Sequence, residues 1–159
     1  MDIIYHPIGV IHSPFTDLID MPIQPTGTAS APGWVEIDPE FVEGLKDLEG
    51  FSHIILLYHL HQVHRTDLTV TPFLGSEPHG VFATRAPTRP NPIGLSIVEL
   101  KGIDGTRLEL GNIDILDGTP LLDIKPYVPD FDSPEGTRIG WLETVRGKVK
   151  NTKSDDRFG

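Results

Sequence analysis

The segment at residues 80–96, GVFATRAPTRPNPIGLS, is the first candidate for chemistry because it holds two arginines on a stiff, proline-rich backbone. Each proline restricts itself and the residue before it, so the chain loses little further entropy when a ligand binds. Guanidinium groups of Arg85 and Arg89 can bind a carboxylate or phosphate through two hydrogen bonds each. The alternative is a surface loop whose arginines pair with the surplus acids of the chain.

Histidines form the second candidate, at the end of the apolar run FSHIILLYHLHQV. His59 and His61 share one strand face, and such a pair can ligate zinc if a third ligand is near. No third ligand is evident in the sequence, so we expect no metal. We expect instead that His61 and Gln62 hydrogen-bond a ligand at the rim of a sheet.

A turn with acidic neighbours forms the third candidate, in NIDILDGTPLLDIKPYV. Backbone N–H groups of the turn Gly118-Thr119 can cradle polar ligand atoms, with Asp114, Asp117 and Asp123 close by. The alternative is a hairpin turn with solvated acids. The sequence contains no P-loop, no G-x-G-x-x-G and no nucleophile elbow, which argues against kinases, Rossmann enzymes and serine hydrolases.

Short strands separated by frequent turns must position these residues. Strands are expected at 3–11, 34–37 and 51–63, in a hairpin around Asp104-Gly105, and from residue 119 to a stop at Pro126. One clear helix is expected at 38–50, where Asp38 can cap, Pro39 can start the first turn and Gly50 can end it. Many strands and a single good helix predict a mainly β protein, either a barrel or a sandwich-like sheet, with irregular loops such as 17–33.

Composition limits the broad class of protein. The 159 residues include no cysteine, 13 Lys and Arg, and 23 Asp and Glu, for a formal net charge of −10. We expect one domain over residues 1–145 and a polar tail over 146–159. No signal peptide or membrane-spanning stretch is evident, which predicts a soluble, cytoplasmic protein. The charge argues against a general nucleic-acid coat protein but leaves room for a local basic groove.

Four stretches in order resemble the TsaA-like family, also described as TrmO- or YaeB-like: IGVIHSPF, DLEGFSHIILLYHLHQ, GVFATRAPTRPNPIGLSIVEL and LDGTPLLDIKPYV. The resemblance runs from about residue 3 to about residue 130. It implies a compact β-barrel, a homodimer and binding of S-adenosylmethionine. It also implies methylation of N6 of threonylcarbamoyl-adenosine beside the anticodon of tRNA, with the tRNA anticodon loop as partner.

The resemblance assigns cofactor-binding positions along the chain. They are Gln24, Pro25, Thr26, His61, Gln62, Arg85, Leu95, Leu116, Asp117, Gly118 and Thr119. The chain departs from the bacterial pattern where Ile23 replaces a basic residue before Gln24, and we expect no substantial extra C-terminal domain. Both departures bear on the affinity for tRNA and the choice of tRNA more than on the cofactor.

Three residues are candidates for the reaction itself. Arg89 is expected to bind a substrate anion, either phosphate or carboxylate. His61 and Tyr58 are conceivable bases for the N6 proton, and the sequence does not choose between them. Two alternatives stay open: a methyltransferase for a small molecule, and a non-catalytic module that binds S-adenosylmethionine.

Overall fold

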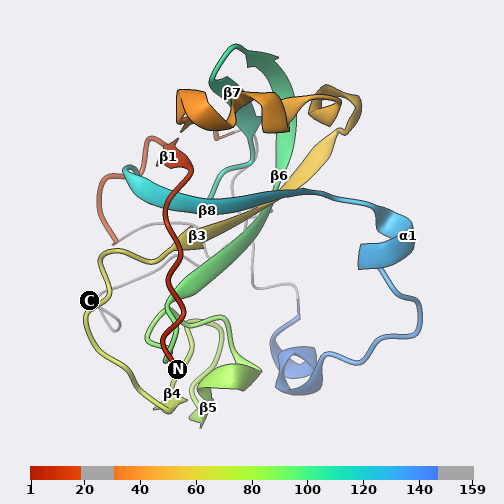
Figure 1. The fold of residues 1–159 in the computed structure, drawn as a ribbon. Coiled ribbons are helices and arrows are strands. Elements are labelled where there is room, and N and C mark those ends of the chain that lie inside the picture. Colours follow the sequence, from red (N-terminus) through yellow and green to blue (C-terminus); the bar gives the residue numbers. More distant parts are fainter. Residues whose placement is uncertain (19–30, 147–159) are drawn as a thin grey trace.

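The computed structural model describes residues 1–18 and 31–146, and six of its strands close into an antiparallel barrel (Figure 1). Around the barrel the order is β1-β2-β7-β6-β3-β8, so the first strand pairs with the last. The strands are β1 Gly9–His12, β2 Gly33–Ile37, β3 His53–His59, β6 Ile93–Asp104, β7 Arg107–Gly111 and β8 Thr119–Pro126. The predicted mainly β barrel is therefore confirmed.

Alternation along the strands explains why the sheet closes around a core. In β3 the even positions Ile54, Leu56 and Tyr58 are buried, whereas the odd positions lie on the outer face. Pairing of β3 with β6 places Leu56 opposite Ser96 and Tyr58 opposite Gly94, so the side chains of Leu56, Ser96 and Tyr58 share the interior. The interior is filled by aliphatic side chains from all six strands and from the segment at 113–115.

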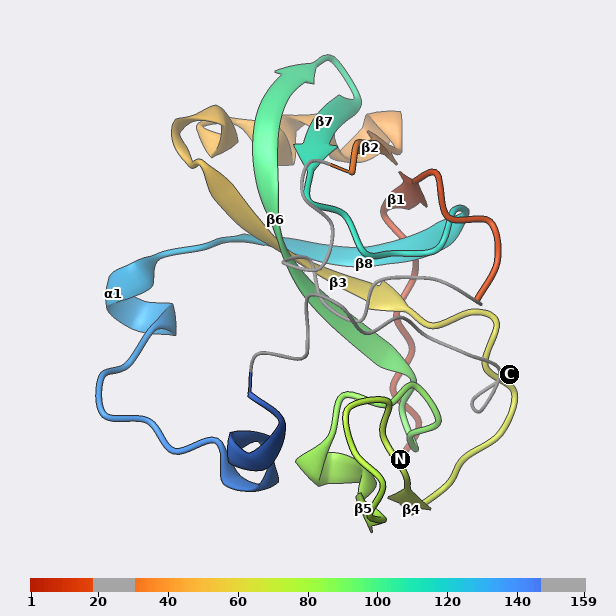
Figure 2. The same ribbon diagram turned by 180° about the vertical axis from the view of Figure 1, so that it is seen from behind.

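A small module of loops covers one end of the barrel. It contains β4 Thr69–Val70, β5 His79–Gly80 and the 3-10 turn η4 Val81–Ala83. The C-terminal 3-10 helix η5 Gly140–Val145 contacts this module from far along the chain (Figure 2). Trp141 stacks on His79 with ring centres 4.3 Å apart and donates from Nε1 to the Ala83 carbonyl over 2.8 Å.

The two turns predicted from Asp-Gly pairs are confirmed. Gly105 joins β6 to β7 and Gly118 precedes β8, with φ values of 61° and 82° that favour glycine. The strand predicted at 119 ends at Pro126, as expected. Most of the predicted loop 17–33, and all but the first residue of the predicted tail 146–159, lie outside the described residues.

Three predicted elements differ from the structure. The strand expected at 51–63 is the shorter β3, so His61 lies beyond the strand and does not share a strand face with His59. The strand expected at 3–11 is paired at Gly9–His12, and the apolar residues Ile3, Ile4 and Tyr5 before it are exposed. The helix expected at 38–50 is two 3-10 segments, η2 Pro39–Leu45 and η3 Leu48–Gly50. Asp47, with φ of 69°, interrupts them, and η2 buries none of its residues, so little packing supports a longer helix. The one α-helix of the described residues, α1 Pro129–Asp132, was not predicted.

Candidate cofactor-binding end of the barrel

The antiparallel topology gathers the predicted site segments at one end of the barrel. Because β3 pairs with both β6 and β8 in antiparallel fashion, the end of β3 lies beside the starts of β6 and β8. β1 also ends there, since Ile11 is opposite Thr119. His61 and Gln62 follow β3, Arg85 precedes β6, Leu95 lies near its start, and residues 116–119 lead into β8. Gln24, Pro25 and Thr26 lie outside the described residues.

The turn at residues 116–119 is fixed against the segment that follows β1. The Asp117 and Gly118 amides donate to the carbonyls of Phe15 and Ile11 at 2.7 and 2.9 Å. The Asp117 carboxylate accepts from the Ser13 amide at 3.1 Å and lies 3.2 Å from His12 Nδ1. Thr119 is buried and its hydroxyl donates to the Leu116 carbonyl. Oδ1 of Asp117 therefore helps to hold the turn in place.

The arginine-proline loop before β6 is held partly by one of its own arginines. Nη1 of Arg89 donates to the carbonyls of Thr84 and Ala86, each at 3.0 Å. Because this nitrogen is engaged with the backbone, Arg89 stabilises the loop, a contribution that the sequence did not indicate. Arg85 is exposed, and its positive charge acts on the buried groups Asp114 and Tyr58.

The end of β3 presents a histidine that is neutral at ordinary pH. Burial, with a further contribution from His59, lowers the pKa of His61 below its ordinary value. The amide of Leu60 donates to the Pro92 carbonyl at 2.8 Å, which joins this segment to the arginine-proline loop. Gln62 is exposed, and Leu95 is 44% exposed on the outer face of β6.

A short chain of hydrogen bonds links side chains of β3, β6 and the segment after β7. Tyr58 Oη and Ser96 Oγ lie 2.8 Å apart, and Ser96 Oγ donates to Asp114 Oδ1 over 2.7 Å. Burial is the main cause that raises the pKa of Asp114 to about 7, and burial together with Asp114 also raises the pKa of Tyr58. The Tyr58 phenol therefore stays protonated, which disfavours its predicted role as a base.

The sequence pattern indicated Asp114 as a candidate but did not connect it with Ser96. Asp114 lies between the buried residues Ile113 and Ile115, and this position gave the only available signal that it is not an ordinary turn acid. Ser96 is 1% exposed and occupies an inward position in β6. The pairing of these two side chains depends on the barrel register, which a pattern of apolar residues does not reveal.

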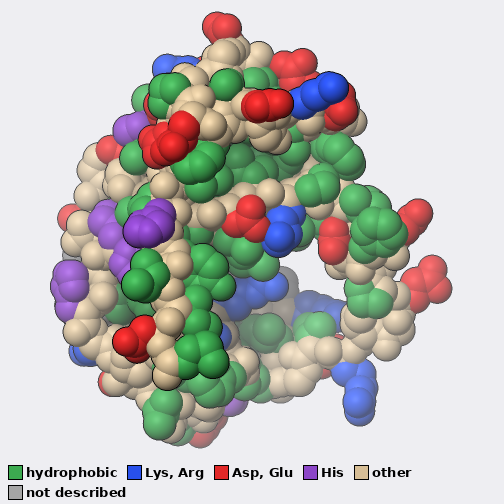
Figure 3. Space-filling view, viewed as in Figure 1, with side chains coloured by type: hydrophobic (Ala, Val, Ile, Leu, Met, Phe, Trp, Pro, Cys, Tyr) green, Lys and Arg blue, Asp and Glu red, His purple; other side chains and the backbone are tan. Residues whose placement is uncertain are grey.

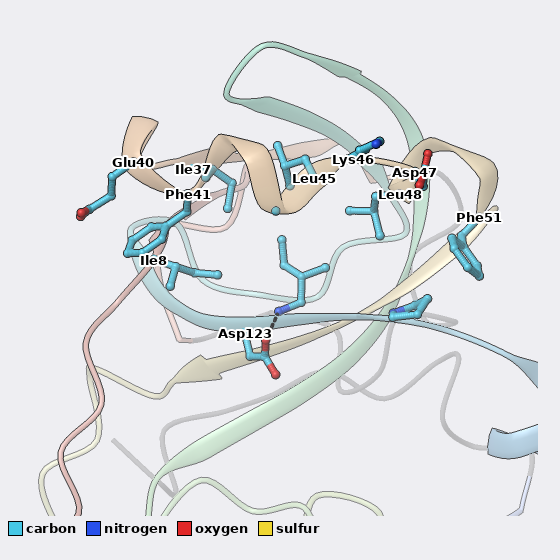
Figure 4. A pocket seen from close by; sticks show the side chains of 13 residues that line it. Ile8, Ile37, Glu40, Phe41, Leu45, Lys46, Asp47, Leu48, Phe51 and Asp123 are labelled. Carbon is cyan, nitrogen blue, oxygen red and sulfur yellow. Dashed lines mark hydrogen bonds between the residues drawn. The ribbon is translucent and has the colours of Figure 1, made fainter.

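A separate hollow lies at the opposite end of the barrel, between η2, η3 and β8 (Figure 4). Its volume is about 540 Å³, and apolar side chains such as Phe41, Leu45 and Phe51 dominate its lining. None of the predicted cofactor residues lines it. Across the described ranges 1–18 and 31–146, no three His, Asp or Glu side chains are grouped closely enough to hold a metal ion.

The fold and the grouped segments define a class of protein: a closed six-stranded antiparallel barrel whose candidate site segments lie together at one end. Residues 10–133 match the model of the tRNA-methyltransferase O N-terminal domain, and the chain belongs to this family. A search for transmembrane helices in the described part of the chain found none long and apolar enough to cross a bilayer.

Named relatives align with most of this chain. A probable S-adenosyl-L-methionine-binding protein of Pyrococcus abyssi is 56% identical over 98% of this chain and 85% of its own length. The tRNA (adenine(37)-N6)-methyltransferase of Escherichia coli is 41% identical over 81% of this chain and 59% of its own. The crystal structure of TrmO from Pseudomonas aeruginosa matches with a TM-score of 0.75 and 44% identity, covering 89% of this chain and 63% of that chain. The chain therefore spans less than two thirds of the last two proteins.

Proposed function

We propose that this protein transfers a methyl group from S-adenosylmethionine to N6 of an adenosine beside the anticodon of tRNA, with threonylcarbamoyl-adenosine as the acceptor. The observation that carries the proposal is the grouping of His61, Arg85 and the 116–119 turn at one end of the barrel. Family membership and the names of the bacterial and archaeal relatives support the same activity.

The residues at this end suit the cofactor, which carries a carboxylate, an ammonium, a sulfonium and an adenine. Arg85 supplies a guanidinium for the carboxylate of the cofactor or of the threonyl group. Gln62 and exposed backbone groups supply hydrogen bonds for the adenine, and Asp117 supplies negative charge for the cationic groups. When bound, the cofactor supplies an electrophilic methyl with a good leaving group, so the chain contributes orientation, exclusion of water and removal of a proton.

The surface charge is arranged in a way that supports tRNA binding despite the net charge of −10. Lys and Arg side chains appear in the recess between the barrel and the chain segment that carries α1 (Figure 3). Most Asp and Glu side chains in this view lie around the top of the barrel and on the outer side of that segment. Separation of the charges lets a phosphate backbone approach a locally basic surface.

A homodimer is part of the proposal and has a candidate surface on the outer face of β6. Ile93, Leu95 and Ile97 are 43%, 44% and 37% exposed, and they alternate along one strand face. Ile55 and Leu57 of β3 lie directly beside them in the sheet. An exposed apolar strip of this kind is typical of a contact between protein chains. Leu95 also places the strip next to the cofactor site.

The proposed activity is tested with S-adenosylmethionine labelled in its methyl group. The protein is incubated with one tRNA prepared with and without threonylcarbamoyl-adenosine, and the nucleosides are analysed by mass spectrometry. We expect labelled methyl in the threonylcarbamoyl-adenosine nucleoside and none in the unmodified tRNA. Label in both tRNAs would contradict the acceptor, and label in neither would contradict the activity.

A non-catalytic S-adenosylmethionine-binding module is the second candidate, and the net charge of −10 favours it because nucleic-acid partners reward basic surfaces. Tight cofactor binding in a calorimeter, together with no turnover on either tRNA, would support it. A small-molecule methyltransferase, the third candidate, predicts activity that salt does not weaken, because no phosphate backbone is bound.

A further inference from the structure

The hydrogen-bond chain Tyr58–Ser96–Asp114 has a defined direction. Ser96 has one hydroxyl proton, and this proton is donated to Asp114 Oδ1 at 2.7 Å. Tyr58, whose Oη lies 2.8 Å from Ser96 Oγ, must then donate its own proton to Ser96. Both protons therefore point along the chain toward the Asp114 carboxylate, which is stabilised as an acceptor.

The three members of the chain lie beside three different segments of the candidate site. Tyr58 is three residues before His61, Ser96 directly follows Leu95, and Asp114 is two residues before Leu116. Much of Asp114 is shielded from bulk water, although part of the residue stays exposed. Arg85, the arginine proposed to bind the cofactor or its acceptor, acts electrostatically on Asp114.

Building on the proposed methyl transfer, we propose that Asp114 accepts the proton that N6 of the acceptor adenosine loses. The N6 lone pair forms the new bond to the methyl carbon while the bond between this carbon and sulfur breaks. The electron pair of the broken bond stays on sulfur, which becomes a neutral thioether, and the N6 proton moves to the carboxylate. One positive and one negative charge disappear together, so the reaction balances without another reactant.

Asp114 is better suited to this step than the two bases considered from the sequence. Burial raises the pKa of Asp114 to about 7, while Ser96, its own backbone amide and Arg85 oppose the increase. The carboxylate is thus a stronger base than usual, and a substantial fraction of it is ionised near neutral pH. Burial keeps Tyr58 protonated, and burial with the influence of His59 makes His61 a weaker base. The charged and titratable groups that act on Asp114 are Arg85, from the loop before β6, and Tyr58, from β3.

The test measures kcat/KM for modified tRNA against pH at saturating cofactor, with purified full-length protein. For the unsubstituted chain we expect a decrease of about tenfold per pH unit below a midpoint of about 7, where the Asp114 carboxylate becomes protonated. Asp114→Asn should lower the maximum of kcat/KM, the plateau reached at higher pH, by about 100-fold or more. It should also remove the decrease at low pH, the acid limb. Ser96→Ala should move the limb to higher pH. The hydrogen bond from Ser96 favours the ionised form of Asp114, so its removal raises the pKa of this carboxyl.

The matched control is Glu109→Gln, which changes a half-exposed acid on β7 that pairs with Arg107. It should keep both the plateau and the limb, and all variants should retain cofactor affinity in a calorimeter. An acid limb that persists unchanged in Asp114→Asn, or that does not move in Ser96→Ala, would overturn the role of Asp114 while leaving the methyltransferase in place. No transfer by the unsubstituted protein would overturn both proposals together.

Discussion

Gly94 shows how one residue sets the geometry of the site. A Cβ at this position would lie 2.2 Å from Cε2 of Tyr58, and two further ring atoms would be within 2.8 Å. The tyrosine ring therefore lies directly against the backbone of β6, which brings its hydroxyl to Ser96. A residue without a side chain is required here because of close approach, since its φ is not in the left-handed region.

Gly94→Ala should lower the free energy of unfolding by about 1–3 kcal/mol, because the added methyl displaces a buried ring from a packed sheet. Urea unfolding followed by circular dichroism measures the difference. Gly102→Ala, on the same strand, meets no atom within 4 Å and serves as the control. We expect its stability to stay within about 1 kcal/mol of the parent. Equal unfolding midpoints for the two variants would contradict the close contact at Tyr58.

Residue types and motif order located the site segments, but they did not assign every role. The loop with Arg85 and Arg89 was recognisable because prolines and arginines together are unusual in a short segment. The hydrogen bonds from Arg89 to the carbonyls of Thr84 and Ala86 were not predictable, because they depend on how the loop folds back on itself. The role of Asp114 was hidden for a similar reason: two partners distant in sequence, Tyr58 and Ser96, define it.

At the scale of elements, the strands were more predictable than the helical segments. Alternation of apolar residues gave β3, and an Asp-Gly turn gave the hairpin of β6 and β7. The helical signal at 38–50 came from local spacing, yet η2 has few buried contacts and Asp47 breaks the path. Tertiary packing decides whether such a short segment becomes a regular helix, and the sequence pattern alone does not report it.

The outer face of β6 allows a test of the proposed homodimer. Ile97→Lys places a charge within the exposed apolar strip, two residues from Leu95, and should shift the protein from dimer to monomer. Sedimentation velocity measures the mass in solution. Phe82→Lys, which changes a side chain 76% exposed outside this strip, should leave the dimer intact. A monomeric parent protein, or a dimer that survives Ile97→Lys, would contradict this surface.

At the scale of the whole molecule, the barrel has two different ends. One collects the loops after β1 and β3 and before β6 and β8, together with the arginine-proline segment. The other holds η2, η3 and the hollow of about 540 Å³ with an apolar lining. Antiparallel closure explains the difference, because it places alternate connections at opposite ends. Chemistry is assigned to the first end because charged and hydrogen-bonding groups converge there.

The most direct test of this assignment is a crystal structure of the complex with S-adenosylmethionine. We expect electron density for the cofactor at the end of β3, in contact with Arg85, Leu95 and the turn at 116–119. Density for the cofactor in the apolar hollow beneath η2, or on the barrel wall away from these residues, would contradict the account.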